Sequence, residues 1–401
     1  MKYNFPHINH INDVLPHIEG RKEFVVAERD GFTVINYVVM TPDLFPPVVT
    51  EADAILRECR GITFCNETGK VVARKFHKFF NVGERMETEF RKLDLSQPHV
   101  ILEKLDGSMI TPYLRDGKVE WHTKMGKTDV ADMVIPFVEA NPQYAELADF
   151  ILRNNNATPI FEFCSRKNRV VIDHPEDRMV LLAVRDNVTG KYWEYELGLE
   201  IPAVEFNVEL VGQHKATFDK DFLEYVRGLV GTEGFVVRFD DGHMLKIKAE
   251  DYLQLHRAKE GISHEKNVWS MVLNESVDDL KSFLDDDDRM RVEDFEVKLW
   301  REVDYAVQHL EMFFGFAMDD LNKRDLSMFE DADRERKKMF AMEYANNYRK
   351  EFKGVLFSMF DGGDVRDLVI QFIKSNVSTG TKLDGIRPLF NNIQFDEREY
   401  E

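Results

Sequence analysis

The sequence predicts an α+β fold in which a part rich in antiparallel β-sheet is followed by an all-helical part. Through about residue 260, short β-rich runs are separated by turn dipeptides, as in hairpins. From about Ser263 onward such runs become rare, and apolar residues recur at helical spacing. A length of 401 residues suits two or three domains, and the change of pattern places one boundary between residues 1–260 and 261–401.

Hairpins are expected wherever a turn dipeptide ending in glycine divides two β-rich runs. Glycine favours such turns because it adopts positive φ angles without steric cost. The dipeptides are Asp30-Gly31, Thr68-Gly69, Asp116-Gly117 and Asp241-Gly242. The predicted hairpins therefore cover residues 24–39, 61–75, 100–123 and 235–248.

Helices are expected where apolar residues return every three or four positions. In the first part this spacing predicts one helix over residues 129–154 and a shorter one over residues 219–229. In the second part it predicts a helix through Leu299, Val303, Val307 and Leu310, and another over residues 339–357. The Phe and Met residues there are expected to form the core, since an amphipathic helix must bury its apolar side.

Charge restricts which partners the chain can bind. A net charge of -20 argues against broad nonspecific binding to nucleic acid, because a negative field repels phosphate. Residues 57–78 are a local exception, with several basic side chains and few acidic ones: Arg57, Arg60, Lys70, Arg74, Lys75 and Lys78. A focused basic site for phosphate therefore remains possible in this segment.

The sequence also indicates the protein's surroundings. No run of eighteen apolar residues predicts a membrane span, and residues 1–20 lack the apolar centre of a signal peptide. The three cysteines lack the spacing of a metal site, so reduced thiols are expected. We expect a monomeric cytoplasmic protein without membrane contact.

Lys104 is the leading candidate for a catalytic residue. It follows the apolar run 100–102 and precedes the turn Asp106-Gly107, so its amine stands at a strand end where backbone N–H groups can meet a phosphate. A lysine amine attacks phosphorus only when deprotonated, so burial or neighbouring cations must lower its pKa. By itself the motif equally fits a hairpin turn with a solvated lysine.

Two acids and two lysines downstream strengthen this interpretation. Glu162 and Glu233 each lie in or beside an apolar strand, where a lone acid needs an ion pair, a metal or a ligand. Lys246 and Lys248 alternate with apolar residues and so share one face of a strand. A bound phosphate explains two lysines on one face, as does a solvated edge strand. Together these residues fit a nucleotidyl-transfer site.

In order and spacing, these motifs resemble the covalent nucleotidyltransferase superfamily, and within it most closely the bacteriophage RNA ligase 1 family. The resemblance covers roughly residues 55–255 and rests on residues 58–62, 78–81, 104–108, 161–163, 168–171, 181–185, 233–236 and 246–248. It implies an ATP-grasp-like adenylyltransferase domain, followed by a helical domain that recognises RNA. Leu105 replaces an acid of some relatives, and strand alternation predicts that it faces away from the nucleotide.

The resemblance implies a role for each matching residue. Lys104 would form lysyl-AMP from ATP. The other implied nucleotide contacts are Arg60 and Lys78 with phosphates, Lys124 with pyrophosphate, Glu162 with ribose, Lys246 and Lys248 with the α-phosphate, and Tyr252 near the nucleotide. The implied Mg²⁺ residues are Glu162, Glu233, Asp278 and Asp279. Lys246 would also lower the Lys104 pKa, and the Asp278–Asp279 pair equally suits a helix N-terminus.

The implied activity is ATP-dependent joining of RNA ends that carry a 5′-phosphate and a 3′-hydroxyl, with a nicked tRNA anticodon loop among the candidate substrates. DNA ligases and GTP-using capping enzymes share the lysine motif but usually continue into a small β-barrel, whereas helices are expected here. A nucleic-acid-binding protein without catalysis is the alternative from another class. The acidic net charge and the two glutamates argue against it.

Overall fold

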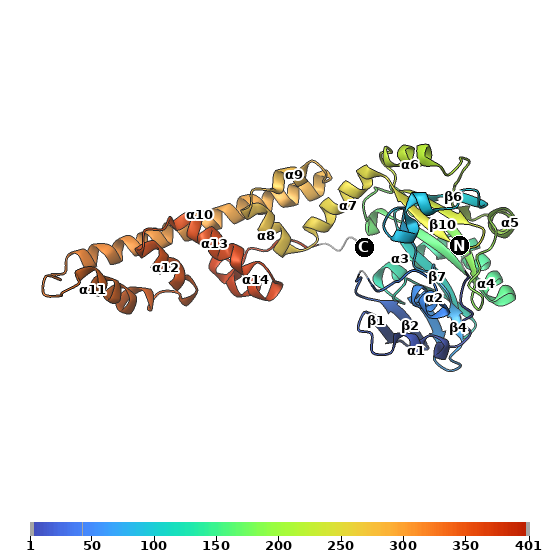
Figure 1. The fold of residues 1–401 in the computed structure, drawn as a ribbon, viewed down its shortest axis with the longest axis horizontal. Coiled ribbons are helices and arrows are strands. Elements are labelled where there is room, and N and C mark those ends of the chain that lie inside the picture. The colour runs from blue at the N-terminus through green and yellow to red at the C-terminus, as the bar shows by residue number, and fades with distance from the viewer. Residues whose placement is uncertain (1–3, 42, 398–401) are drawn as a thin grey trace. The chain divides into compact units, whose positions relative to one another are not determined.

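The computed structural model of the protein describes residues 4–41 and 43–397, except for the side chain of Asp279. It divides into two compact units between Leu253 and Gln254, within helix α7 (Glu250–Ile262) and a few residues before the predicted boundary. Within the described residues, all strands belong to the first unit and the second is helical (Figure 1). This confirms the predicted α+β class.

Three sheets form the first unit, and most of their strand pairs are antiparallel. The four-stranded sheet has the order β1 (Phe24–Glu28), β2 (Phe32–Tyr37), β3 (Arg60–Cys65), β4 (Val71–Ala73). The second has the order β11 (Glu209–Leu210), β10 (Arg178–Asp186), β9 (Ala157–Cys164), β7 (Ser108–Arg115), β8 (Lys118–His122). The third has the order β12 (Gln213–His214), β6 (His99–Lys104), β13 (Gly234–Phe239), β14 (Met244–Lys248), β5 (Phe80–Asn81).

The predicted hairpins are present, with one change. β1–β2, β3–β4 and β13–β14 are antiparallel pairs around their predicted turns. In residues 100–123 the hairpin is β7–β8, while β6 leaves to pair with β13 in the third sheet. The turn Asp106-Gly107 therefore connects two sheets, which places Lys104 at the passage between them.

The helix predicted over residues 129–154 is in fact two helices, α3 (Asp129–Ala140) and α4 (Gln143–Asn155). Pro142 explains the break, because proline lacks an N–H donor and disfavours helical backbone in the preceding residue. The shorter predicted helix is confirmed as α6 (Lys220–Arg227). The unit also contains α1 (Leu15–Ile18), α2 (Glu51–Glu58) and α5 (Ile201–Glu205).

The second unit is built around the long helix α10 (Asp286–Asn322), whose predicted apolar residues Leu299, Val303, Val307 and Leu310 are all buried. The helix predicted over residues 339–357 is interrupted: α11 (Ala332–Met339) is followed by a π-helical turn, Phe340–Ala345, before α12 (Lys353–Phe360). The remaining helices are α8 (Glu265–Leu273), α9 (Val277–Lys281), α13 (Val365–Asn376) and α14 (Gly380–Ile386).

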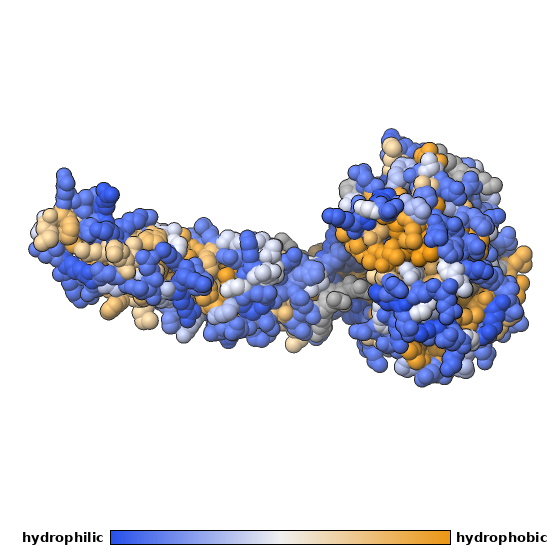
Figure 2. Space-filling view, turned by 90° about the horizontal axis from the view of Figure 1, so that it is seen from below, coloured by the Kyte–Doolittle hydropathy of each residue, from blue (hydrophilic) through white to orange (hydrophobic). Residues whose placement is uncertain are grey.

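Hydrophilic residues cover most of the surface shown in Figure 2, with apolar residues gathered in patches. Among the described helices, none combines the length and the apolar character that crossing a membrane requires. All three cysteines are free thiols, as expected from their spacing.

Candidate active site

The third sheet places Lys104 beside an acid and a second lysine. In its register Gly234 lies opposite both Lys104 and Lys248, and Glu233 directly precedes it. Lys104 Nζ lies 2.7 Å from Glu233 Oε1, and Lys248 Nζ lies 2.9 Å from the same oxygen. Gly234 has a φ of 134°, and a Cβ there would lie 2.0 Å from the Ile247 carbonyl oxygen, so glycine is required.

Glu233 is held in its charged form by this arrangement. Its carboxylate is buried, which by itself would raise its pKa, but the ammonium groups of Lys104 and Lys248 hold that pKa below its ordinary value. Because one carboxylate oxygen already accepts both amines, Glu233 fixes the position of the Lys104 amine.

A pocket of about 350 Å³ opens beside this cluster, lined by side chains from all three sheets. Six residues predicted from the sequence line it: Arg60, Lys78, Lys104, Lys124, Glu162 and Lys246. Glu233 is instead connected to the pocket through its ion pair with Lys104, and Lys248 through its ion pair with Glu233. Leu105 also lines the pocket, so the expected outward orientation was wrong. β6 ends at Lys104, and strand alternation does not continue past it.

Lys246 and Glu162 have strongly shifted pKa values within the pocket. Burial, reinforced by the charge of Lys104, lowers the pKa of Lys246 to about 7. Burial raises the pKa of Glu162 to about 8, against the attraction of Lys104. Both shifts favour the neutral forms, so a bound phosphate at Lys246 and a bound cation at Glu162 would restore charges that the pocket disfavours.

Lys78 is held among aromatic rings at another part of the pocket wall. Its Nζ lies 5.1 Å from the ring centre of Tyr37 and 5.4 Å from that of Phe80, and it donates a 3.4 Å hydrogen bond to the Tyr37 hydroxyl. Burial lowers the pKa of Lys78. The contacts leave the ammonium group close to Arg60, which also lines the pocket.

Asp106 and Tyr252 form a structural link that the sequence did not reveal. The Tyr252 hydroxyl donates to Asp106 Oδ1 at 2.7 Å, while the N–H groups of Val171 and Ile172 donate to Oδ2 at 2.8 and 2.6 Å. The buried Asp106 thus fixes the turn after Lys104 instead of facing the pocket. Tyr252, expected near the nucleotide, places its ring 4.9 Å from Lys248 Nζ. The sequence features that could have pointed to this link were the turn Asp106-Gly107 and the motif at residues 168–171.

The predicted acidic pair belongs to the second unit, whereas the residues that line this pocket belong to the first. Asp278 belongs to the second unit, where its exposed side chain accepts a 3.0 Å hydrogen bond from Lys281, and the side chain of Asp279 lies outside the described part. Among the described residues, no three or more His, Cys, Asp or Glu side chains gather closely enough to hold a metal ion. Mg²⁺ is commonly held by one or two carboxylates together with substrate phosphates. The Glu162 carboxyl in a lysine-lined pocket fits that donor set.

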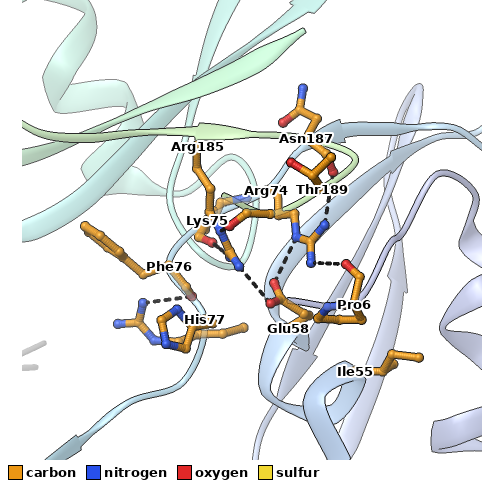
Figure 3. Close-up of polar contacts among 12 residues, drawn as sticks. Pro6, Ile55, Glu58, Arg74, Lys75, Phe76, His77, Arg185, Asn187 and Thr189 are labelled. Atoms are coloured by element: carbon orange, nitrogen blue, oxygen red, sulfur yellow. Dashed lines mark hydrogen bonds and ion pairs between the residues drawn. The ribbon is translucent and has the colours of Figure 1, made fainter. Parts of the chain in front are cut away.

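The basic segment 57–78 proves to be largely structural. Glu58 Oε2 lies 3.0 Å from Arg74 Nε, and Glu58 Oε1 lies 2.7 Å from Arg185 Nη2, all three side chains being fully buried (Figure 3). Lys75 is also buried and donates to the Gly61 carbonyl oxygen and the Thr63 hydroxyl. From the expected basic cluster, only two residues line the pocket: Arg60 and Lys78.

Comparison with known proteins assigns the chain to a family. Residues 58–253 match the protein family described as RNA ligase. A Thermovibrio ammonificans protein named "Putative RNA ligase" is 30% identical over 286 residues, covering 67% of this chain and 70% of the relative. The chain belongs to the RNA ligase family. The matched segment of this RNA ligase contains Lys104, Glu233 and Lys248, and it also contains most of the residues that line the pocket.

Two further similar proteins also carry names of RNA ligases. RNA ligase 1 of bacteriophage TS2126 is 28% identical over 247 residues, covering 59% of this chain and 60% of the relative. A solved archaeal ATP-dependent RNA ligase aligns with a TM-score of 0.43 and 14% identity, covering 63% of this chain and 64% of that one. This RNA ligase thus spans about 60% of the length of the phage relative.

The raised pKa of Glu162 predicts a pH-dependent stability. Between its ordinary value of 4.5 and about 8, the folded protein retains a proton that the unfolded chain has lost, so this carboxyl makes folding less favourable as pH rises through that interval. Glu162→Gln removes the titration. We expect its melting temperature, relative to that of the wild type, to rise by a few degrees from pH 5 to pH 8 without nucleotide or metal. A pH-independent difference would contradict the shift.

Proposed function

We propose that this RNA ligase uses ATP to join RNA ends bearing a 5′-phosphate and a 3′-hydroxyl, with Lys104 as the residue that carries AMP. The observation that supports this most directly is the position of the Lys104 amine. It lies at the wall of a pocket that also contains Lys246 and Glu162, and Glu233 fixes it at 2.7 Å. A nucleophile, a cation for phosphate and a carboxyl for a metal are thereby brought together.

In the first step the Lys104 ammonium group, which is paired with Glu233 in the free protein, would give up one proton to solvent, and the neutral amine would attack the α-phosphorus of ATP. A nitrogen–phosphorus bond forms, the bond to pyrophosphate breaks, and the amine loses its proton. Lys246 and Lys248 would neutralise charge on the reacting phosphate, and Arg60, Lys78 and Lys124 would hold the remaining phosphates. A divalent ion such as Mg²⁺, held at Glu162, would supply further charge neutralisation. Tyr252 would act indirectly, by supporting Lys248.

In the later steps AMP would move from Lys104 to the RNA 5′-phosphate, and the 3′-hydroxyl of the other end would then displace it. Positioning of the two ends and stabilisation of charge would provide most of the acceleration. The helical second unit would recognise the RNA by its shape, for which a tRNA with a nicked anticodon loop is a suitable substrate. The roles of Asp278 and Asp279 in metal binding belong to this proposal.

Two linked assays test the proposal. The protein is incubated with Mg²⁺ and either α-labelled ATP or α-labelled GTP, and then with 5′-phosphorylated single-stranded RNA or DNA. We expect covalent labelling by ATP, and conversion of RNA to circles that resist phosphatase. Labelling by GTP alone would favour a capping activity, and the absence of any label would leave a nucleic-acid-binding role.

A further inference from the structure

Arg238 is a buried cation that the steps above do not use. It lines the same pocket, yet only 6% of the residue is exposed. Its Nη1 atom is buried without a hydrogen-bond partner, and no acidic side chain in the described chain lies within ion-pair distance. Burial lowers the pKa of Arg238 to about 10. A guanidinium in such surroundings destabilises the empty protein unless a ligand supplies acceptors.

The strand register locates Arg238 within the pocket. Along β13, Gly234 lies opposite Lys104 and Lys248, Val236 opposite Leu102 and Lys246, and Arg238 opposite Val100 and Met244. Val236, Arg238 and Lys246 all line the pocket, so they share one face of the sheet. At about 3.3 Å per residue, Arg238 lies roughly 13 Å along the strand from the row of Lys104. Because the same pocket is lined by Lys104 and by Arg238, a nucleotide with its α-phosphate at Lys104 could extend its base toward Arg238.

The surroundings of Arg238 suit a flat, weakly polar group. Leu102, Leu182, Val211 and Val236 line this pocket, which thus combines a cationic cluster with an apolar wall. Tyr195 lies near Arg238, and its hydroxyl group donates a hydrogen bond to the Val211 carbonyl oxygen at 2.7 Å. Because arginine only donates hydrogen bonds, its ligand must provide an acceptor.

We propose that Arg238 donates a hydrogen bond to a ring nitrogen of adenine and thereby positions the base of ATP in the pocket. The proposal rests on the function proposed above. Adenine is a flat ring system whose N1, N3 and N7 atoms accept hydrogen bonds. Its faces can pack on apolar side chains while one ring nitrogen accepts from the guanidinium group. A phosphate is the less suitable partner, because Lys104 and Lys248 lie at the other end of this strand face and Lys246 lies midway along it, so cations for phosphate are already present there.

Binding without turnover tests the contact. In a Lys104→Met background, calorimetry gives the affinity of Mg²⁺-ATP and of 1-, 3- and 7-deaza-ATP, with Arg238 or with Arg238→Met. We expect Arg238→Met to weaken ATP binding about tenfold. One deaza analogue should bind about tenfold less tightly than ATP when Arg238 is present, and no less tightly when it is absent, as a double-mutant cycle requires.

A second measurement separates a lost contact from a damaged fold. Without nucleotide, Arg238→Met should melt at a higher temperature than its parent, because a buried unpaired cation is gone, and ATP should raise its melting temperature less. Arg238→Lys keeps the charge, and we expect intermediate affinity. Arg91→Met, at an exposed arginine paired with Glu89, is the matched control and should change neither quantity.

Unchanged ATP affinity in Arg238→Met would overturn the inference. It would also be overturned if each of the three analogues bound more weakly than ATP by the same factor with Arg238 as with Arg238→Met. Either result leaves the proposed function intact if the wild-type enzyme is labelled by ATP. If neither labelling nor nucleotide binding occurs in any version of the protein, the proposed function fails, and this inference fails with it.

Discussion

Lys104→Met is expected to abolish covalent labelling by α-labelled ATP. The amine is the group proposed to bond to phosphorus, and neither Lys246 nor Lys248 can replace it. Lys246 lies on another strand row, and Lys248 is held by Glu233. Removing a covalent nucleophile commonly costs about a thousandfold or more. Labelled protein is measured after denaturing electrophoresis, with Lys118→Met, at an exposed lysine of β8, as the control that keeps the label.

A second substrate shows whether the loss is specific. RNA that already carries a 5′-adenylate needs no lysyl-AMP, so Lys104→Met should still join it to a 3′-hydroxyl. If Lys104→Met loses this joining as well and melts at a lower temperature, damage to the fold explains the loss of label. If it retains the label, another residue is the nucleophile.

Much of the candidate active site could be predicted, because patterns in neighbouring residues indicate several of its members. The Asp-Gly turn after Lys104, the alternation of Lys246 and Lys248, and the strand-borne Glu162 each follow from local spacing. The structure brings Lys104, Lys246 and Glu162 to one pocket. Strand pairing then adds what local patterns do not contain: β6 and β14 flank β13, so Glu233 lies within reach of two lysines.

The remaining interactions depend on contacts between distant segments. Tyr252 binds Asp106 across a long stretch of sequence, and nothing in either motif specifies that partner. Arg74 belongs to the basic segment that the sequence offered for phosphate, and Arg185 ends a motif of the resemblance, yet both are buried against Glu58. The net charge of a segment cannot distinguish arginines that bind phosphate from arginines that hold sheets together. That distinction depends on where a buried carboxylate lies.

The largest expected effect on stability comes from Glu58. Replacing it with alanine leaves the two buried guanidinium groups of Arg74 and Arg185 without their shared carboxylate. Arg74 directly follows β4 of the first sheet, and Arg185 lies on β10 of the second sheet (Figure 3). Breaking a buried ion pair by removing one partner typically costs about 3–5 kcal/mol. We expect Glu58→Ala to lower the free energy of unfolding by that amount, as measured by urea denaturation.

The direction of the pH dependence follows from the same contacts. Burial alone would raise the pKa of Glu58, but the guanidinium groups of Arg185 and Arg74 hold it below its ordinary value of 4.5. The stabilisation is therefore present above pH 4.5 and is lost as the pH falls below it. The difference between wild type and Glu58→Ala should accordingly shrink on acidification below pH 4.5.

Two further variants decide whether the unpaired charge causes the loss. Glu58→Met combined with Arg74→Met and Arg185→Met removes the whole cluster and should recover much of the stability, because apolar side chains of similar size can replace a buried ionic triad. Glu89→Ala, which breaks only the surface pairs with Arg91 and Lys92, should leave stability unchanged. If the triple variant were less stable than Glu58→Ala, the hydrogen bonds from Arg74 and Arg185 to backbone carbonyls, and not the charge balance at Glu58, would be the main contribution of this cluster.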